Sequence, residues 1–467
     1  MTEAVDICVI GAGAGGLSVA SGAAQMGARV VLIEAAEMGG DCLNSGCVPS
    51  KALIAAAQHA QSTRSGGLGI AGMAPRVDFT AVMAHVRATI AAIAPHDSQE
   101  RFEGLGVRVI RARARFTSPR SLEAGGQRIS ARRFVLATGT RPAIPPIPGL
   151  VDTPYLTNET IFGLTALPDH LIVMGGGPIG VELAQAFRRL GARVTVIEAA
   201  TPLGREDPEL AQVALARLRA EGVEIHEKTP ARAISGTDGA IAVETEAGTI
   251  RGTHLLVATG RAPVTDDLGL DLAGIETHQG AVKVDRHLRS SNRRVYAVGD
   301  VAGRGQFTHL AGYHAGIVLR ALTLGLPASL RDDHIPRVTY TDPEIAQVGL
   351  TEAEARARWP DIEVIRTPLA GNDRARAEGI HDGVLKLVIR RGRPLGAGIV
   401  GPGAGELIAF WALALAARRK LSAIAGTVLP YPTLSEVSKS ATGTYFSPKL
   451  FANPWIERMV RLVQRLP

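Results

Sequence analysis

The residues between Val5 and Glu34 read VDICVIGAGAGGLSVASGAAQMGARVVLIE. They predict an apolar strand, a turn containing Gly11, Gly13 and Gly16, a helix of small residues, and a second strand that ends at Glu34. Glycines at this spacing permit a tight turn and let a pyrophosphate approach the helix N-terminus. The acid after the second strand can accept a hydrogen bond from an adenosine ribose. The stretch therefore predicts a dinucleotide-binding unit.

The same pattern occurs a second time. Residues 169–198 read DHLIVMGGGPIGVELAQAFRRLGARVTVIE, with Gly175, Gly177 and Gly180 in the turn and Glu198 at the end. The offset is constant, since 175 − 11 = 164 and 198 − 34 = 164. Both copies keep every glycine and the acid, which argues against one copy being purely structural. Two dinucleotide folds in one chain imply two different nucleotides.

A short stretch between the two copies holds two of the three cysteines. Residues 39–51 read GGDCLNSGCVPSK. In a regular helix the Cα atoms of Cys42 and Cys47 would stand about 8.6 Å apart, whereas a disulfide tolerates at most about 7 Å. The intervening Asn-Ser-Gly residues form helices poorly, so a distortion there is cheap, and a strained bridge is of the easily reduced kind. Two buried thiols in an ordinary loop are the alternative reading.

Length and composition narrow the class of protein. At 467 residues the chain is too long for one core and should contain about three domains. The formal charge of 51 − 44 = +7 comes from arginines spread along the chain, which argues against nucleic-acid binding. Three cysteines exclude a secreted disulfide scaffold, the N-terminus does not read as a signal peptide, and no apolar run is long enough to span a bilayer. We therefore expect a cytoplasmic protein without a membrane partner.

The remaining pattern suggests domain boundaries. A strand that ends in Gly299-Asp300 offers a carboxylate to a hydroxylated ligand, and strands alternate with turns from about Arg337. An apolar helix is expected at 406–420, where a subunit interface would cover it. A basic amphipathic helix is expected at 455–466. We expect it to pack against the protein, and contact with a membrane surface is the alternative. The predicted domains are 1–148, 149–264, 265–336 and 337–467.

The order of these motifs resembles that of the flavin-dependent pyridine nucleotide-disulfide oxidoreductases, the family of dihydrolipoamide dehydrogenase, glutathione reductase and mercuric reductase. The resemblance covers essentially the whole chain. It implies an α/β fold with two Rossmann-like dinucleotide-binding domains, the first for FAD and the second for NAD(P)H, plus an α+β C-terminal dimerisation domain. It also implies a homodimer whose active sites contain residues of both subunits.

The resemblance assigns roles residue by residue. Cys42 matches the interchange thiol that attacks substrate, Cys47 the thiolate against the flavin, and Lys51 with Glu182 an ion pair near the flavin's reactive nitrogen. The implied FAD site comprises Gly11, Gly13, Gly16, Glu34, Lys51, Thr138, Gly139 and Asp300. The implied NAD site comprises Gly175, Gly177, Gly180, Glu198 and Gly260. A carboxylate at Glu198 favours NADH over NADPH, although Arg193 and Arg205 lie near it in sequence.

One position departs from the family pattern. The family's C-terminal acid–base histidine is replaced by Tyr431, whereas Pro432, Thr433 and the catalytic candidate Glu436 remain. A tyrosine has an ordinary pKa near 10, far from the optimum for proton shuttling, so Tyr431 is expected to donate a hydrogen bond or bind substrate. His309 and His314 are alternative bases, with a structural role as the favoured reading.

The leading hypothesis is an FAD-dependent enzyme that passes electrons from NADH through the Cys42–Cys47 disulfide to a small disulfide, or the reverse from a dithiol. A mercuric ion reductase is the second hypothesis, because the resemblance to those enzymes includes a tyrosine where the histidine is expected. The sequence has no cysteine after Cys47 to match their C-terminal pair. A diaphorase or quinone reductase with idle cysteines is a third. A non-catalytic flavoprotein scaffold is a fourth, and the retained Cys42, Cys47, Lys51 and Glu182 argue against it.

Overall fold

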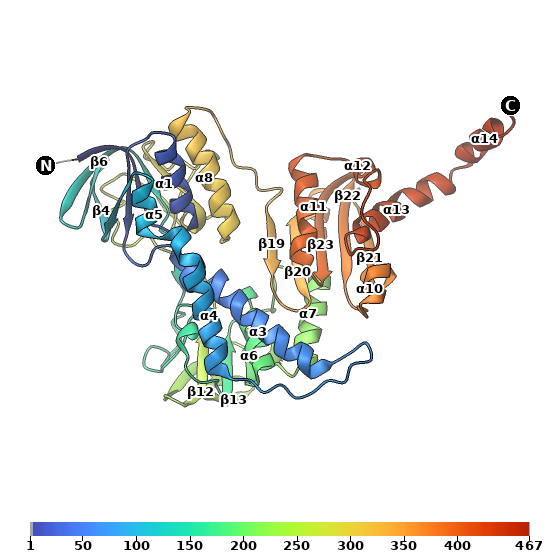
Figure 1. Cartoon of the computed structure of the whole chain (residues 1–467), viewed down its shortest axis with the longest axis horizontal. Helices are drawn as coiled ribbons and strands as arrows, with labels where there is room; N and C mark the ends of the chain where they lie inside the picture. Colours follow the sequence, from blue (N-terminus) through green and yellow to red (C-terminus); the bar gives the residue numbers. More distant parts are fainter. Residues whose placement is uncertain (1–2, 467) are drawn as a thin grey trace. The chain divides into compact units, whose positions relative to one another are not determined.

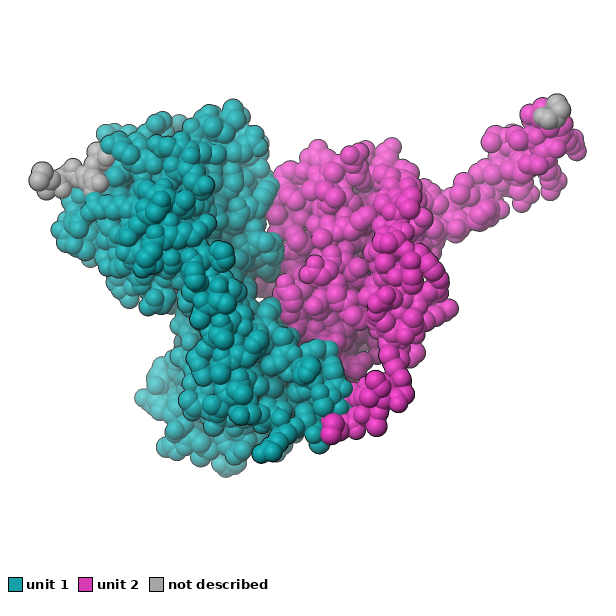
Figure 2. Space-filling model, viewed as in Figure 1, with its two compact units in different colours: residues 1–64, 74–199, 224–330 teal, residues 65–73, 200–223, 331–467 magenta. Residues whose placement is uncertain are grey.

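The structure is a computed structural model and describes residues 3–466. The chain forms two compact units (Figure 2). The first unit contains the residues up to Arg64 together with Ala74–Ala199 and Glu224–Leu330. The second unit contains Ser65–Met73, Ala200–Val223 and the residues from Arg331 onward. The four domain boundaries given above stay a prediction.

A largely parallel sheet carries the first glycine turn (Figure 1). Its parallel strands run in the order β3-β2-β1-β6, and β18 pairs in parallel with the last residues of β6. Their bounds are β1 Glu3–Ile10, β2 Val30–Glu34, β3 Val107–Arg111, β6 Gln127–Leu136 and β18 Val295–Ala297. The antiparallel strands β5 (Ser121–Ala124) and β4 (Ala114–Ser118) complete the sheet. Helices α1 (Ala14–Gln25) and α8 (Thr308–Thr323) pack together, and every residue of β2 is buried, as expected of a covered parallel strand.

A second parallel sheet repeats this arrangement in the order β10-β9-β8-β14. Its strands are β8 His170–Met174, β9 Arg193–Ile197, β10 Glu224–His226 and β14 His254–Val257. Helix α6 (Pro178–Leu190) follows the second glycine turn, and an antiparallel meander is formed by β11 (Ala233–Thr237), β12 (Ala240–Thr245) and β13 (Gly248–Gly252). The two predicted dinucleotide folds are therefore present, with corresponding strand orders.

Cys42 and Cys47 lie on helices that connect β2 to β3. Helix α2 (Gly40–Asn44) is followed by the longer α3 (Cys47–Ser65). The helical region after α3 is divided into α4 (Phe79–Ile93), a 3-10 turn (Ala94–Asp97) and α5 (Gln99–Gly104). Pro95 stands in the turn, where its missing N–H and fixed ring prevent a continuous helix.

The second unit is built on an antiparallel sheet in the order β19-β20-β23-β22-β21. The strands are β19 Pro336–Thr339, β20 Glu344–Gly349, β21 Glu363–Pro368, β22 Val384–Arg390 and β23 Arg393–Gly401. The apolar helix α11 (Ala404–Ala416) packs on β20 and β23 and buries Trp411. It ends four residues before the predicted Lys420, because Arg418 adopts a positive φ of 52°. The chain continues through α12 (Leu421–Ala425), α13 (Glu436–Phe451) and α14 (Pro454–Val463).

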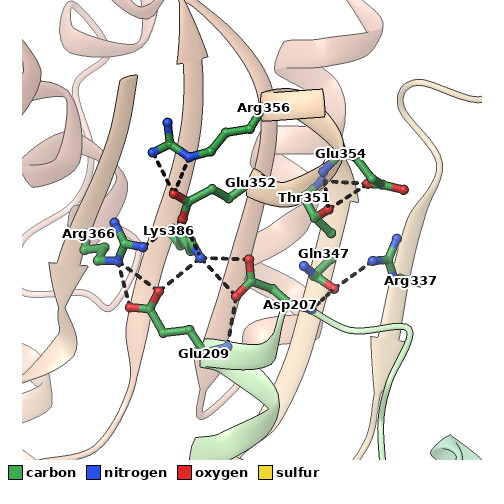
Figure 3. A network of polar contacts seen from close by, with 10 residues as sticks. All are labelled: Asp207, Glu209, Arg337, Gln347, Thr351, Glu352, Glu354, Arg356, Arg366 and Lys386. Atoms are coloured by element: carbon green, nitrogen blue, oxygen red, sulfur yellow. Dashed lines mark hydrogen bonds and ion pairs between the residues drawn. The ribbon is translucent and has the colours of Figure 1, made fainter. Parts of the chain in front are cut away.

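Helix α7 (Pro208–Ala220) is held to this sheet by a polar network (Figure 3). The ammonium of Lys386, on β22, lies 2.9 Å from Asp207, 3.0 Å from Glu209 and 3.0 Å from Glu352. The Lys386 side chain is only 7% exposed, and Arg366 bridges Glu209 and Glu352 from the other side. Paired charges thus join α7 to the sheet at this junction. No helix among the described residues is both long and apolar enough to cross a bilayer.

Candidate active site

The first and third glycines of each turn are required by the packing of the chain itself. Gly11 and Gly175 have φ values of +104° and +112°, which residues with a side chain rarely adopt. A Cβ on Gly16 would lie 1.9 Å from the carbonyl oxygen of Gly11, and a Cβ on Gly180 would lie 2.0 Å from that of Gly175. These four glycines therefore allow the helix to approach the strand.

The middle glycines are different, because nothing in the protein fills the space beside them. A Cβ on Gly177 would meet no protein atom within 4 Å, and a Cβ on Gly13 would meet only the Cα of Gly40 at 4.0 Å. Both residues are extended and precede the first turns of α6 and α1, which carry no acidic side chain. Free N–H groups and the positive end of each helix dipole thus face open space. The two turns fit the pyrophosphates of FAD and of a pyridine nucleotide.

The acids at the ends of β2 and β9 hold the turns in shape. The backbone N–H of Ala12 donates to Glu34 Oε2 at 2.5 Å, and the N–H of Gly176 donates to Glu198 Oε2 at 2.7 Å. The N–H of Ala36 also donates to Glu34 Oε1 at 2.7 Å. Carboxylate oxygens have further lone pairs, so each acid can still accept from a ribose hydroxyl.

Asp300 follows β18 and lies beside the turn after β6. Its Oδ2 accepts from the hydroxyl of Thr140 at 2.7 Å, and burial raises the pKa of its carboxyl. The neighbouring Thr138 donates to the carbonyl of Val264 at 2.6 Å. Gly139 adopts a φ of +65°, and an added Cβ there would meet nothing within 4 Å. A Cβ on Gly260, whose φ is +137°, would likewise meet nothing within 4 Å.

The two cysteines are brought together by a break between helices. Helix α2 ends at Asn44, Ser45 leaves the helical conformation with φ −145°, and α3 starts at Cys47. A Cβ on Gly46 would stand 3.2 Å from the Cα of Cys42, so only glycine fits between the two turns without displacement. The distortion predicted from the sequence is confirmed. Both cysteines are free thiols in the structure, with Cys47 exposed and Cys42 half-buried.

The thiols have opposite acidities. A hydrogen bond from Cys42 lowers the pKa of Cys47 to about 6, with help from Thr308 and the positive charge of Lys51 and against the effect of burial. The same hydrogen bond, together with burial, raises the pKa of Cys42. The hydroxyl of Thr308, at the start of α8, lies 3.5 Å from Cys47 Sγ. At neutral pH the pair therefore favours a thiolate on Cys47 and a thiol on Cys42.

The predicted partners Lys51 and Glu182 are in contact. Lys51 Nζ on α3 lies 2.8 Å from Glu182 Oε2 on α6. The Glu182 side chain is 7% exposed and that of Lys51 is 35% exposed, so the ammonium keeps an open side. A carboxylate in this position orients the Lys51 ammonium.

A cavity of about 380 Å³ opens onto Cys42. Its wall includes Cys42 and Thr308, but Cys47 does not line it. The polar side chains in the wall also include Ser18, Ser21, Asp97 and Arg101. Burial raises the pKa of Asp97. The two thiols therefore face different spaces, and the cavity offers Cys42 to a molecule of some size.

Several residues of this site carry no signal that sequence reasoning used. Thr308, Asp97 and Arg101 come from segments far from residues 39–51, and only the fold brings them together. Arg261 follows the pair Thr259-Gly260 and forms an ion pair with Asp41 at 3.0 Å. A signal for Arg261 exists, because Arg141 comes directly after a similar segment, Thr138-Gly139-Thr140.

The C-terminal candidates belong to the second unit. Tyr431 is 71% exposed, and its hydroxyl donates to Asp373 Oδ2 at 3.2 Å, which raises the pKa of the tyrosine. Glu436 begins α13 and accepts from the N–H of Thr433 at 3.4 Å. Both contacts are made within the second unit. The catalytic roles of Tyr431 and Glu436 stay a prediction.

The two histidines differ in setting. His314 is fully buried, its Nδ1 accepts from the N–H of Gly299 at 3.1 Å, and burial lowers its pKa to about 4. His309 stacks on the ring of Phe307 with 5.3 Å between centroids. The packing of His314 supports the structural reading.

Comparison with known proteins agrees with this geometry. Residues 5–315 match the family model described as pyridine nucleotide-disulphide oxidoreductase, and residues 335–442 match the dimerisation domain of that family. A mercuric reductase of Shigella flexneri is 39% identical over 461 residues, covering 95% of this chain and 81% of that protein. A dihydrolipoyl dehydrogenase of Geobacillus stearothermophilus is 33% identical over 447 residues, covering 93% of this chain and 94% of that protein.

Solved structures extend the likeness to the whole fold. The HOCl-induced flavoprotein disulfide reductase RclA of Escherichia coli superposes with a TM-score of 0.84 at 31% identity, covering 94% of this chain and 99% of that chain. LpdA of Mycobacterium tuberculosis gives a TM-score of 0.86 at 29% identity, covering 94% of this chain and 100% of that chain. The chain therefore belongs to the class I pyridine nucleotide-disulfide oxidoreductases, enzymes that use FAD and NAD(P)H.

Proposed function

We propose that this enzyme passes electrons from NADH through FAD to the Cys42–Cys47 pair and on to a small disulfide, or runs in reverse from a dithiol to NAD⁺. The observation that carries the proposal is the cavity of about 380 Å³ that is lined by Cys42 and not by Cys47. A space of this size suits an organic disulfide, since a bare metal ion needs only a small fraction of it. Bound FAD supplies the two-electron link between the nicotinamide and the thiols.

The thiol chemistry follows from the two acidities. The Cys42 sulfur attacks one sulfur of the substrate disulfide, a mixed disulfide forms, and the other substrate sulfur leaves as a thiolate. The Cys47 thiolate then attacks Cys42 Sγ, which re-forms the Cys42–Cys47 disulfide and expels the second substrate thiolate. The electron pair thus moves from the dithiol to the substrate.

The Cys42–Cys47 pair can itself provide the general base, a role that the family's C-terminal histidine would otherwise have. The thiol of Cys42 donates its proton toward Cys47, and this hydrogen bond is the largest influence on both acidities. Transfer of that proton to Cys47 produces the attacking Cys42 thiolate. Cys47 then passes the proton to the departing substrate thiolate, and so becomes the thiolate that attacks Cys42 Sγ in the second step. We infer that Tyr431 binds substrate or donates a hydrogen bond, because its pKa is raised further by Asp373.

NADH is the favoured nucleotide. Glu198 stands at the end of β9 and would accept from a ribose 2′-hydroxyl but repel a 2′-phosphate. Arg193, a cation that a 2′-phosphate would need, pairs with Glu224 at 2.8 Å. The match to the dimerisation domain supports a homodimer. We also propose that the enzyme is cytoplasmic.

Mercuric ion is the second candidate, because mercuric reductases are among the relatives reported above. Tyr431, which replaces the histidine, is also the residue that the resemblance associates with those enzymes. Against it, the described residues contain no group of three or more His, Cys, Asp or Glu side chains that could hold a metal ion. Cysteine is also absent from the printed sequence after Cys47.

The decisive experiment is an anaerobic NADH titration of the FAD-loaded enzyme, followed by lipoamide, glutathione disulfide, cystine and Hg(II) in turn. We expect a long-wavelength thiolate-to-flavin band at two-electron reduction, and reoxidation by at least one disulfide. The Cys42→Ser variant should keep reduction of its flavin by NADH and lose turnover of the disulfide. Turnover of Hg(II) alone would support the second candidate, and disulfide turnover that survives Cys42→Ser would contradict the thiol relay.

A further inference from the structure

We propose that α14 binds the surface of an anionic lipid bilayer and attaches the enzyme peripherally to a membrane. The sequence predicts a helix here that packs against the protein. In the structure none of its residues is buried, and it lies beyond the end of α13, away from the five-stranded sheet (Figures 1 and 2). The helix also lies outside the match to the family's dimerisation domain, which ends at residue 442.

Large apolar side chains are gathered on one side of α14. Trp455, Met459 and Val463 recur at intervals of four residues, which places them on the same face of a helix. They are 76%, 63% and 54% exposed. Leu462 is 63% exposed and joins this face in the helical projection, and Leu466, after the end of the helix, is 66% exposed. An exposed apolar face of this kind needs a partner.

The opposite side of the helix is basic. Arg458 and Arg461 stand on α14, and Arg465 follows its end. Glu457 is the single acid of residues 454–466, so the local charge is +3 − 1 = +2. The guanidinium of Arg458 lies 5.5 Å from the ring centroid of Trp455. Arginines along one side, with tryptophan and leucine on the other, are the arrangement of helices that lie in the headgroup region of a bilayer.

Charge decides between a lipid surface and a second copy of the helix. Two copies of α14 packed face to face would bring Arg458 and Arg461 of each copy close together, with only one acid in each helix to offset them. Anionic headgroups complement the arginines, while the acyl boundary covers the apolar face. The apolar surface continues onto the end of α13, where Phe451 is 77% exposed.

The length of α14 predicts weak, reversible binding for one helix. Ten residues span about 15 Å, which permits one short helix to lie in the interface plane but not to cross the bilayer. A homodimer would present two such helices, and their combined binding would exceed that of one helix by a large factor.

Co-sedimentation of the FAD-loaded full chain with lipid vesicles tests the proposal. We expect binding to phosphatidylcholine vesicles containing about one third phosphatidylserine to be at least about tenfold stronger than to phosphatidylcholine alone, and to weaken at high salt. The double substitution Met459→Glu/Val463→Glu should abolish this binding. Val428→Glu is the matched control, because Val428 is 89% exposed and lies outside α14.

A second readout reports the position of the helix directly. Brominated lipids should quench the fluorescence of Trp455, and the loss of quenching in Trp455→Phe would show that the signal comes from α14. Absence of binding to any vesicle, or binding unchanged by the double substitution, would overturn the proposal. So would dissociation of the dimer by the same substitution, measured by sedimentation velocity without lipid, because a second copy would then cover the face.

Discussion

The guanidinium of Arg261 lies 3.0 Å from the carboxylate of Asp41, the residue before Cys42. The same arginine donates through Nε to the hydroxyl of Thr140 at 2.8 Å, and that hydroxyl donates to Asp300. One side chain, only 10% exposed, thus connects the thiol segment to the acid that follows β18. Residues assigned to the substrate side and to the cofactor side therefore share one cation.

Replacing Arg261 by Met should weaken both ends of this connection. Asp41 would lose its partner beside Cys42, and the pKa of Asp300, which the arginine lowers, would rise further. We expect roughly tenfold slower disulfide turnover and easier release of FAD on heating, measured by flavin fluorescence. Arg141→Met is the control, because Arg141 pairs with Asp266 at the exposed surface and should change neither quantity. Equal effects of the two substitutions would contradict the role of Arg261.

The acidity of Cys47 predicts a pH dependence of the reduced enzyme. Because the pKa of Cys47 is lowered to about 6, its thiolate predominates above about pH 6 and is lost as the pH falls below that value. The long-wavelength absorbance of the two-electron-reduced enzyme should follow this titration. Thr308→Val removes a hydrogen bond that lowers the pKa and should move the midpoint to higher pH. A midpoint that does not move would show that Thr308 leaves the thiolate unaffected.

Substitutions at two glycines of the second turn should affect nucleotide binding in one case and folding in the other. Gly177→Ala places a methyl group in open space in front of α6, so the protein should fold normally while KM for NADH rises roughly tenfold. Gly180→Ala places its methyl group 2.0 Å from the carbonyl of Gly175 and should greatly reduce the yield of folded protein. Thermal unfolding and NADH kinetics of both variants check this contrast. An unchanged KM in Gly177→Ala would mean that the nucleotide lies elsewhere.

Removing the charge of Lys386 should destabilise the second unit. Lys386→Met leaves Asp207, Glu209 and Glu352 beside one another without their shared ammonium. Loss of one partner from a buried ionic cluster costs about 3–5 kcal/mol, which urea unfolding would detect. Lys283→Met is the control, since Lys283 pairs with Glu276 at the surface and its loss should leave stability unchanged.

The same cluster predicts sensitivity to acid. Burial opposes ionisation of Glu352, but hydrogen bonds from Lys386 and Arg356 outweigh it and lower the pKa to about 2. A lowered pKa contributes stability above the ordinary value of 4.5, and this contribution is lost as the pH falls from there toward 2. Unfolding free energies measured between pH 6 and pH 3 should therefore decline less steeply in Glu352→Gln than in the unaltered protein.

Local patterns predicted those parts of the molecule that depend on neighbouring residues. The two glycine turns, the acids Glu34 and Glu198 and the break before Cys47 are local features, so their spacing in the sequence was sufficient. The contact between Lys51 and Glu182 was expected through the family resemblance, since the two residues lie 131 positions apart.

Other parts of the site could not be read from the chain. Thr308 reaches Cys47 across 261 positions, and Arg261 reaches Asp41, on α2, from a distant part of the sequence. Asp97 lines the cavity because Pro95 divides the helical region into α4 and α5. Such contacts are set by tertiary packing, for which local propensity carries no information.

The Lys386 cluster also limits how the polypeptide can be divided. Asp207 and Glu209 belong to the 200–223 segment, whereas Lys386 and Glu352 come from the chain after Arg331. A fragment beginning at residue 337 would therefore carry a lysine in its sheet that has lost two of its three acidic neighbours, on a surface that α7 normally covers. Gene truncation at the start of the dimerisation domain will give an aggregation-prone polypeptide, and a soluble fragment requires 200–223 to be grafted back.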